Sequence, residues 1–178
     1  TSGAWNTHAI IFSSNVEMNE VTVNNAIAVQ AGAILNNVAI NEANGYYGLW
    51  INGNGQSVTM NGGSITATNG GRGIKIADQY IDAPAQVTLN VTGTDFNTAK
   101  KAAVLVSSKA GAQIVASNVD ITDVVDKVNF VWVDEDWAAN FGNVTVNNAP
   151  AAQENADAFT VAITEGEKVV GYYKTLAA

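Results

Sequence analysis

Hydrophobic and polar residues alternate with a period of two along most of the chain, in short runs that end at Gly, Asn, Ser or Asp. Such a run predicts a β-strand, because successive side chains of a strand point to opposite faces. A first family of runs, rich in Ile, Leu and Val, lies at 10–12, 27–29, 49–51, 74–76, 103–106 and 130–133. A second family mixes apolar residues with Asn and Thr and lies at 18–25, 35–41, 60–68, 91–97, 115–122 and 141–148.

The spacing of these runs indicates which β-fold they form. The two families alternate without exception, and apolar anchors within a family recur at steps of 17 to 31 residues. A solenoid repeats the same strands in every turn, whereas a sandwich is not expected to interleave two strand types so regularly. The sequence therefore predicts an all-β fold, a single-stranded right-handed parallel β-helix of about six turns. The two predicted interior ladders are Ile10, Ile27, Leu49, Ile74, Val104 and Val131, and Val21, Val38, Ile65, Phe96, Val119 and Val144.

Asn and Gly are abundant, with 22 and 16 copies among 178 residues. Corners between strands need left-handed or tight backbone conformations, which these two residue types adopt at the least cost. Asn side chains in equivalent positions of successive turns also stack and hydrogen-bond to one another. The fold thus accounts for the Asn content without a ligand.

The predicted organisation is a β-helix over residues 1–150 and a C-terminal strand extension, cap or start of a following module over residues 151–178. In the second part, alternating runs at 158–164 and 169–176 flank a turn at 165–168, which predicts a β-hairpin. A solenoid needs its open ends covered, and the hairpin is a candidate for that cover. Because the sequence starts at Thr1 without an initiating Met, we expect it to be a piece of a longer polypeptide.

Charge and composition exclude several classes of function. The net charge is −8 and only 8 residues are Lys or Arg, so a nucleic-acid partner is not expected. The absence of Cys rules out disulfides and Cys-based metal sites. No stretch is apolar over the roughly 18 residues that a membrane span requires, so membrane insertion is not expected either.

The short apolar strands with Asn-rich corners, such as Val-Thr-Val-Asn-Asn at 21–25 and 144–148, resemble the β-helix repeats of the pectate-lyase-like superfold, over residues 8–148. The segment 165–178 looks like the lead-in of modular surface proteins of gut bacteria, in which Tyr-x-x-Leu-x-x-Ala opens a new β-helix module. Tyr173-Lys-Thr-Leu176 matches its first half. The resemblance implies a secreted or surface-anchored bacterial protein, an adhesin or a carbohydrate-related protein, with neighbouring modules as partners.

Candidate ligand-binding residues gather around two tryptophans. In the first-family strands, Trp50 and Trp132 point away from the interior, three turns apart on one face, or roughly 14 Å at the spacing of neighbouring strands. Rings beside carboxylates suit sugars, because the ring face stacks on CH groups while the acids bond hydroxyls. The predicted site is Trp50, Trp132, Asp134, Asp136 and Trp137, with a glycan or host surface ligand as its partner. We expect no obligatory cofactor, but Asp134, Glu135 and Asp136 leave calcium open. The opposing reading is that the aromatic rings pack under long loops or against a neighbouring module.

The alternative is a small polysaccharide lyase or glycoside hydrolase acting on acidic polysaccharide. A lyase would use Arg72 or Lys75 as base near Asp78 and Asp82, and a hydrolase would use clustered acids such as Asp120, Asp123 and Asp126. Against an enzyme stand the single Arg, the net charge and the lack of Asn-x-Asp and Gly-His-Gly motifs; the single histidine, His8, is interpreted as a surface or capping side chain. We therefore expect no catalytic residues and a non-enzymatic extracellular module that serves as a stalk or an adhesin-type display surface.

Overall fold

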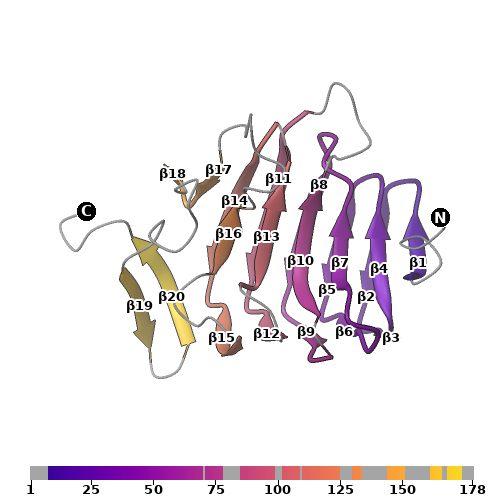
Figure 1. Ribbon diagram of the computed structural model, residues 1–178, viewed down its shortest axis with the longest axis horizontal. Coiled ribbons are helices and arrows are strands. Elements are labelled where there is room, and N and C mark those ends of the chain that lie inside the picture. Colours follow the sequence, from indigo (N-terminus) through magenta and orange to yellow (C-terminus); the bar gives the residue numbers. More distant parts are fainter. Residues whose placement is uncertain are drawn as a thin grey trace.

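A computed structural model shows the predicted parallel β-helix of about six turns (Figure 1). The structure describes residues 8–69, 71–77, 85–98, 102–108, 110–124, 130–133, 144–150, 161–165 and 168–173. These residues form β-strands, turns and bends and contain no helix. Three stacked sheets, called sheets A, B and C here, run along the solenoid. Each of the first five turns contributes one strand to each sheet, and the sixth turn, as far as the structure describes it, contributes strands to sheets A and B.

Sheet A contains the first family of strands, and all of its strands are parallel. Its order follows the sequence: β1 (His8–Phe12), β4 (Ala26–Val29), β7 (Tyr47–Ile51), β10 (Arg72–Ala77), β13 (Val104–Ser107) and β16 (Val131–Val133). The predicted first ladder is confirmed residue by residue, because Ile10, Ile27, Leu49, Ile74, Val104 and Val131 are consecutive register partners.

The second family of runs divides between two sheets. Sheet B consists of β2 (Val16–Asn19), β5 (Ala33–Asn36), β8 (Ser57–Asn61), β11 (Val87–Thr92), β14 (Ala112–Ser117) and β17 (Val144–Val146), and β18 (Ala149–Pro150) adds to it in antiparallel orientation. Sheet C consists of β3 (Thr22–Asn24), β6 (Ala39–Asn41), β9 (Ser64–Ala67), β12 (Asp95–Thr98) and β15 (Asp120–Val124).

A left-handed corner residue separates sheet B from sheet C in five successive turns. Glu20, Asn37, Gly62, Gly93 and Asn118 have φ angles of 54°, 52°, 67°, 62° and 51°. In the first four of these corners the N–H group of the corner residue donates to the last carbonyl of the sheet B strand in the next turn, as from Asn37 to Asn61 at 2.8 Å. These four corners are therefore held by the turn that follows them.

The second predicted ladder is wrong in its register. Val21, Val38 and Val119 directly follow the corner residue; Val38 and Val119 are fully buried as predicted, whereas Val21 is 39 % exposed. The register partners within sheet C are instead, from turn to turn, Val23, Ile40, Ile65 and Phe96. Val144 lies in sheet B, where it pairs with Ala112. The left-handed residue at the corner interrupts the regular inward/outward alternation of side chains. A period-two pattern in the sequence does not reveal this shift.

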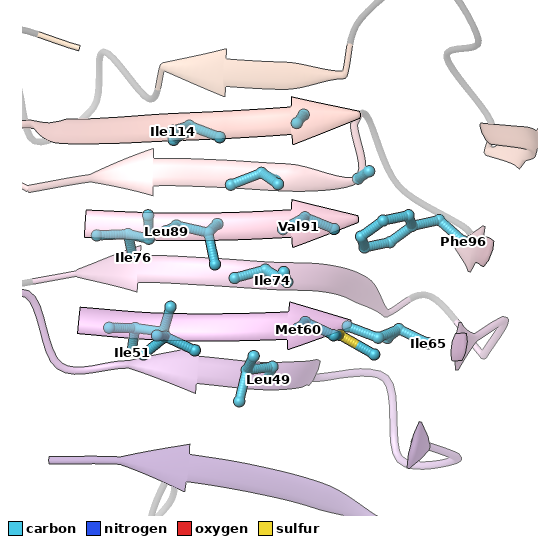
Figure 2. Packing of buried hydrophobic residues seen from close by; sticks show 14 of the residues in the cluster. Leu49, Ile51, Met60, Ile65, Ile74, Ile76, Leu89, Val91, Phe96 and Ile114 are labelled. Atoms are coloured by element: carbon cyan, nitrogen blue, oxygen red, sulfur yellow. The ribbon is translucent and has the colours of Figure 1, made fainter. Parts of the chain in front are cut away.

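The interior is apolar and continuous. Figure 2 shows Leu49 and Ile74 of sheet A and Leu89 of sheet B stacked between the sheets, with Ile65 and Phe96 closing the side toward sheet C. Side chains along the coil's axis are fully buried, as at Ile27, Leu49 and Ile74. Successive turns thus share a single core.

The predicted stacking of Asn side chains is confirmed on the outside of the coil. Asn36 donates to Asn19 at 2.8 Å and Asn61 donates to Asn36 at 2.9 Å, along sheet B. On sheet C, Asn41 donates to Asn24 at 3.2 Å. The predicted C-terminal hairpin also forms, from β19 (Val161–Glu165) and β20 (Lys168–Tyr173), and β20 lies next to β15.

Candidate ligand-binding faces

The outer face of sheet A carries the two tryptophans on one line. Register pairs connect Trp50 to Lys75, Lys75 to Leu105, and Leu105 to Trp132. The two tryptophans are therefore three strands apart in one outward column, as the strand alternation predicts.

Trp50 is covered even though it points away from the core. Its side chain is 3 % exposed, and the ring of His8 stacks on the indole at a centroid distance of 5.5 Å and an interplanar angle of 29°. Ala28 and Ala77 form a small cluster with Trp50 that is separate from the main core. The expectation of an exposed ring at Trp50 is wrong, because small neighbours and a stacked imidazole leave the ring little contact with solvent. His8 is accordingly a packing residue on this face.

Trp132 is half-buried in β16 and keeps part of its surface open to solvent. The other predicted site residues, Asp134, Asp136 and Trp137, lie outside the described residues, as does Glu135 of the possible calcium site. Within the part of the chain that the structure describes, no group of three His, Cys, Asp or Glu side chains is placed to hold a metal ion.

A cluster that sequence reasoning did not assemble lies beside Trp50. Lys75 donates from Nζ to the Tyr47 hydroxyl at 3.0 Å, and Nζ is 4.6 Å from the centroid of that ring. Arg72 pairs in register with Tyr47, and its Cζ is 5.6 Å from the same centroid. The structure thus brings together Arg72 and Lys75, the two base candidates of the lyase alternative. Asp78 and Asp82, their suggested companions, lie outside the described residues.

The acids of the hydrolase alternative lie on sheet C. Asp120 pairs in register with Asp95, and Asp123 pairs with Asn97. Asp123 is exposed and Asp120 is half-buried, while Asp126 lies outside the described residues. The two described acids of this alternative therefore lie on one strand, β15, and Asp95 on the neighbouring strand β12 adds a third carboxylate next to Asp120.

Glu42 is the one carboxylate among the described residues that is almost fully buried, at 3 % exposure. Its Oε1 accepts a hydrogen bond from the Asn44 N–H, and its Oε2 accepts from the N–H groups of Gly45 and Tyr46, at 3.1 and 3.0 Å. Both carboxylate oxygens of Glu42 thus accept hydrogen bonds from the backbone of the loop that leads into β7. Glu42 is therefore a structural cap of this loop.

The outer face of sheet B has a hollow of about 470 Å³ across β2, β5 and β8. Its floor is apolar, with Ile34 43 % exposed beside Ala33. Polar groups surround the floor: Asn15, Glu17, Ser57 and Thr59. The signal in the sequence is Ile34, an apolar residue on the outward side of a strand whose neighbours Ala33 and Leu35 are buried.

The protein is therefore a parallel β-helix whose outer faces carry a hollow on sheet B and a cluster of two cations on sheet A. Comparison with protein-family models, with curated proteins and with solved structures yields no match to this chain. No helix in the described part of the chain has the length and apolar character to cross a membrane.

Proposed function

We propose that this chain is a non-enzymatic, extracellular β-helix module of a bacterial surface protein. It acts as a rigid stalk or adhesin-type display surface, it binds a carbohydrate or another host surface ligand on its outer faces, and it adjoins neighbouring modules of the same polypeptide. The resemblance to pectate-lyase-like repeats and to modular bacterial surface proteins supports the extracellular location and the bacterial surface protein. The stack of turns around one core supports the mechanical role.

The hollow on sheet B is the observation that carries the binding role. A sugar ring presents CH groups on one face and hydroxyl groups around its edge. The exposed side chain of Ile34 offers an apolar contact for the CH groups, while Glu17 and Thr59 flank it on the adjacent strands. The volume of about 470 Å³ lies in the range of small-ligand sites.

A glycan-array screen of the wild-type protein and an Ile34→Ala variant tests this role. Val115→Ala is the matched control, because Val115 occupies the same outward column of sheet B, outside the hollow, and is 48 % exposed. We expect glycan hits that disappear in Ile34→Ala and persist in Val115→Ala. An array without hits, or hits that both variants retain, would contradict binding in the hollow. A Trp132→Ala plus Trp137→Ala variant tests the sheet A face in the same screen.

The enzymatic alternative is favoured by one observation, the pairing of Arg72 and Lys75 around Tyr47. A lyase acting on acidic polysaccharide would use a basic side chain to remove a proton next to a uronate carboxyl group. Incubation with pectin or alginate, with absorbance of unsaturated uronates as the readout, tests it. Absorbance that rises with wild-type protein and not with Lys75→Met would replace the display role with a catalytic one.

A further inference from the structure

Two cations on the outer face of sheet A share one aromatic ring. Lys75 reaches the Tyr47 hydroxyl, and the Arg72 guanidinium lies 5.6 Å from the centroid of the same ring. Lys75 is only 7 % exposed. Like charges that face one ring repel each other, and the ring itself offers each of them only a modest attraction.

Neither cation has a carboxylate partner among the described residues. The hydrogen bond to the Tyr47 hydroxyl is the polar contact of Lys75, and the buried Nε of Arg72 has no hydrogen-bond partner. Burying a charge without a counter-charge is expensive, and proteins normally pair such groups. A buried Lys beside an Arg with an unused donor is therefore a site at which an anion would restore the balance.

We propose that Arg72 and Lys75 bind an oxoanion group of a ligand that this surface recognises. This inference rests on the proposed display function and adds a second contact, on sheet A, for a ligand that carries a carboxylate, sulfate or phosphate group. Tyr47 and Arg72 are half-exposed, so the group reaches the cluster from their side. Arg72 supplies its planar guanidinium, and Lys75 supplies an ammonium already oriented by Tyr47.

The net charge of −8 does not prevent this binding. At physiological ionic strength the Debye length is about 8 Å, so distant carboxylates are screened while the two cations act at contact distance. The net charge thus repels anions only weakly at long range, while Arg72 and Lys75 attract an oxoanion group at contact distance.

Titration calorimetry and thermal unfolding with sodium sulfate, phosphate and acetate, against chloride at matched ionic strength, test the proposal. We expect at least one oxoanion to bind the wild-type protein and raise its melting temperature. Arg72→Gln, at a half-exposed position, and Lys75→Met are each expected to weaken binding about tenfold or more, since each removes a charge-assisted hydrogen bond. The preferred anion distinguishes a carboxylate from a sulfate or phosphate ester as the source.

Two further variants keep the result interpretable. Tyr47→Phe keeps the ring and both cations but removes the hydroxyl that orients Lys75, so we expect it to weaken binding less than Arg72→Gln or Lys75→Met does. Lys168→Gln in β20 removes one positive charge from the hairpin and is expected to bind like the wild-type protein. Equal responses of wild type and Arg72→Gln to all three anions would overturn the proposal, because sulfate stabilises proteins without a site by exclusion. Such a result leaves glycan binding in the sheet B hollow unaffected, so the two proposals fail separately.

Discussion

Asn36 donates a side-chain hydrogen bond of 2.8 Å to Asn19, its register partner on the neighbouring strand of sheet B. Asn61 in turn donates to Asn36 at 2.9 Å, so three turns are connected by one line of amides on the outside of the coil. The same position continues as Thr92 and Ser117, whose hydroxyl groups are 3.2 Å apart. The interior ladders of apolar residues therefore have a polar counterpart on the surface.

The middle amide of this line contributes to stability. Asn36→Ala removes the bonds to Asn19 and Asn61 and a third bond, of 3.2 Å, to Glu17, and we expect it to lower the free energy of unfolding by about 1 kcal/mol, because exposed hydrogen bonds each contribute little net stability. Urea denaturation measures the change. Gln113→Ala, an exposed outward position of β14, is the control and is expected to be neutral. A neutral Asn36→Ala would show that water replaces these bonds without cost.

The corner at Glu20 is strained. Glu20 has a φ of 54°, a conformation that Asn and Gly fill at four equivalent corners. Glu20→Asn is expected to stabilise the protein by about 1 kcal/mol, because Asn tolerates the left-handed region better than Glu. Glu20→Gln is the matched control, since it removes the charge and keeps the side-chain shape. If both variants are equally stabilising in thermal unfolding, the charge and not the backbone is the cause.

Gly63 and Gly93 have similar backbone conformations and different surroundings. Their φ angles are 78° and 62°, but a Cβ on Gly63 would lie 2.2 Å from the Val38 carbonyl oxygen, while a Cβ on Gly93 would meet nothing closer than 3.9 Å. Gly93→Ala is expected to cost about 1 kcal/mol from backbone strain alone. Gly63→Ala adds a clash with backbone and is expected to cost about 3 kcal/mol or more. Equal losses in denaturant titrations would refute the close packing of these turns.

The buried cap at Glu42 is tested by removing its oxygens. Glu42→Ala leaves three N–H groups of the following loop without their acceptor, and a loss of about 3 kcal/mol is expected. Glu42→Gln keeps one acceptor oxygen and is expected to lose less. Glu17→Gln on the surface of sheet B is the control. A Glu42→Ala protein as stable as the control would contradict the role of Glu42 as a cap.

Trp50 and Trp132 are expected to respond differently to truncation. Trp50→Ala removes a ring that is packed against His8 and two alanines, with a loss of about 3 kcal/mol. Trp132→Ala removes a half-exposed ring, with a loss of about 1 kcal/mol. Chemical denaturation followed by circular dichroism compares the two. Equal losses would mean that both rings are equally packed, leaving neither available to a ligand.

The sequence predicts the solenoid because its apolar anchors recur wherever a turn returns to sheet A. Ile10, Ile27 and Leu49 stand in the predicted register, because the irregularity in the pairing of β1 with β4 falls between His8 and Ile10 and the pairing is regular from Ile10 onward. The second ladder is lost at the corner, where Glu20 or Asn37 inserts a left-handed residue that hydropathy cannot reveal.

The candidate sites were less accessible to prediction for a different reason. Alternation gives the direction of a side chain, as for Trp50, but it does not show what covers it, and His8 lies far away in the sequence. Tyr47 precedes Lys75 by a whole turn, so only the register of β7 and β10 brings the two together. The hollow at Ile34 likewise depends on three strands at once.

The register of sheet A has a consequence for the length of the molecule. Each strand pairs only with the strands of the preceding and following turns, so a whole turn can be added or removed without changing the surroundings of distant turns. Every turn advances the coil by about 4.8 Å, the spacing of neighbouring strands. The length of the solenoid along its axis is therefore set by the number of turns. Duplication or loss of a turn can change this length during evolution without a new core.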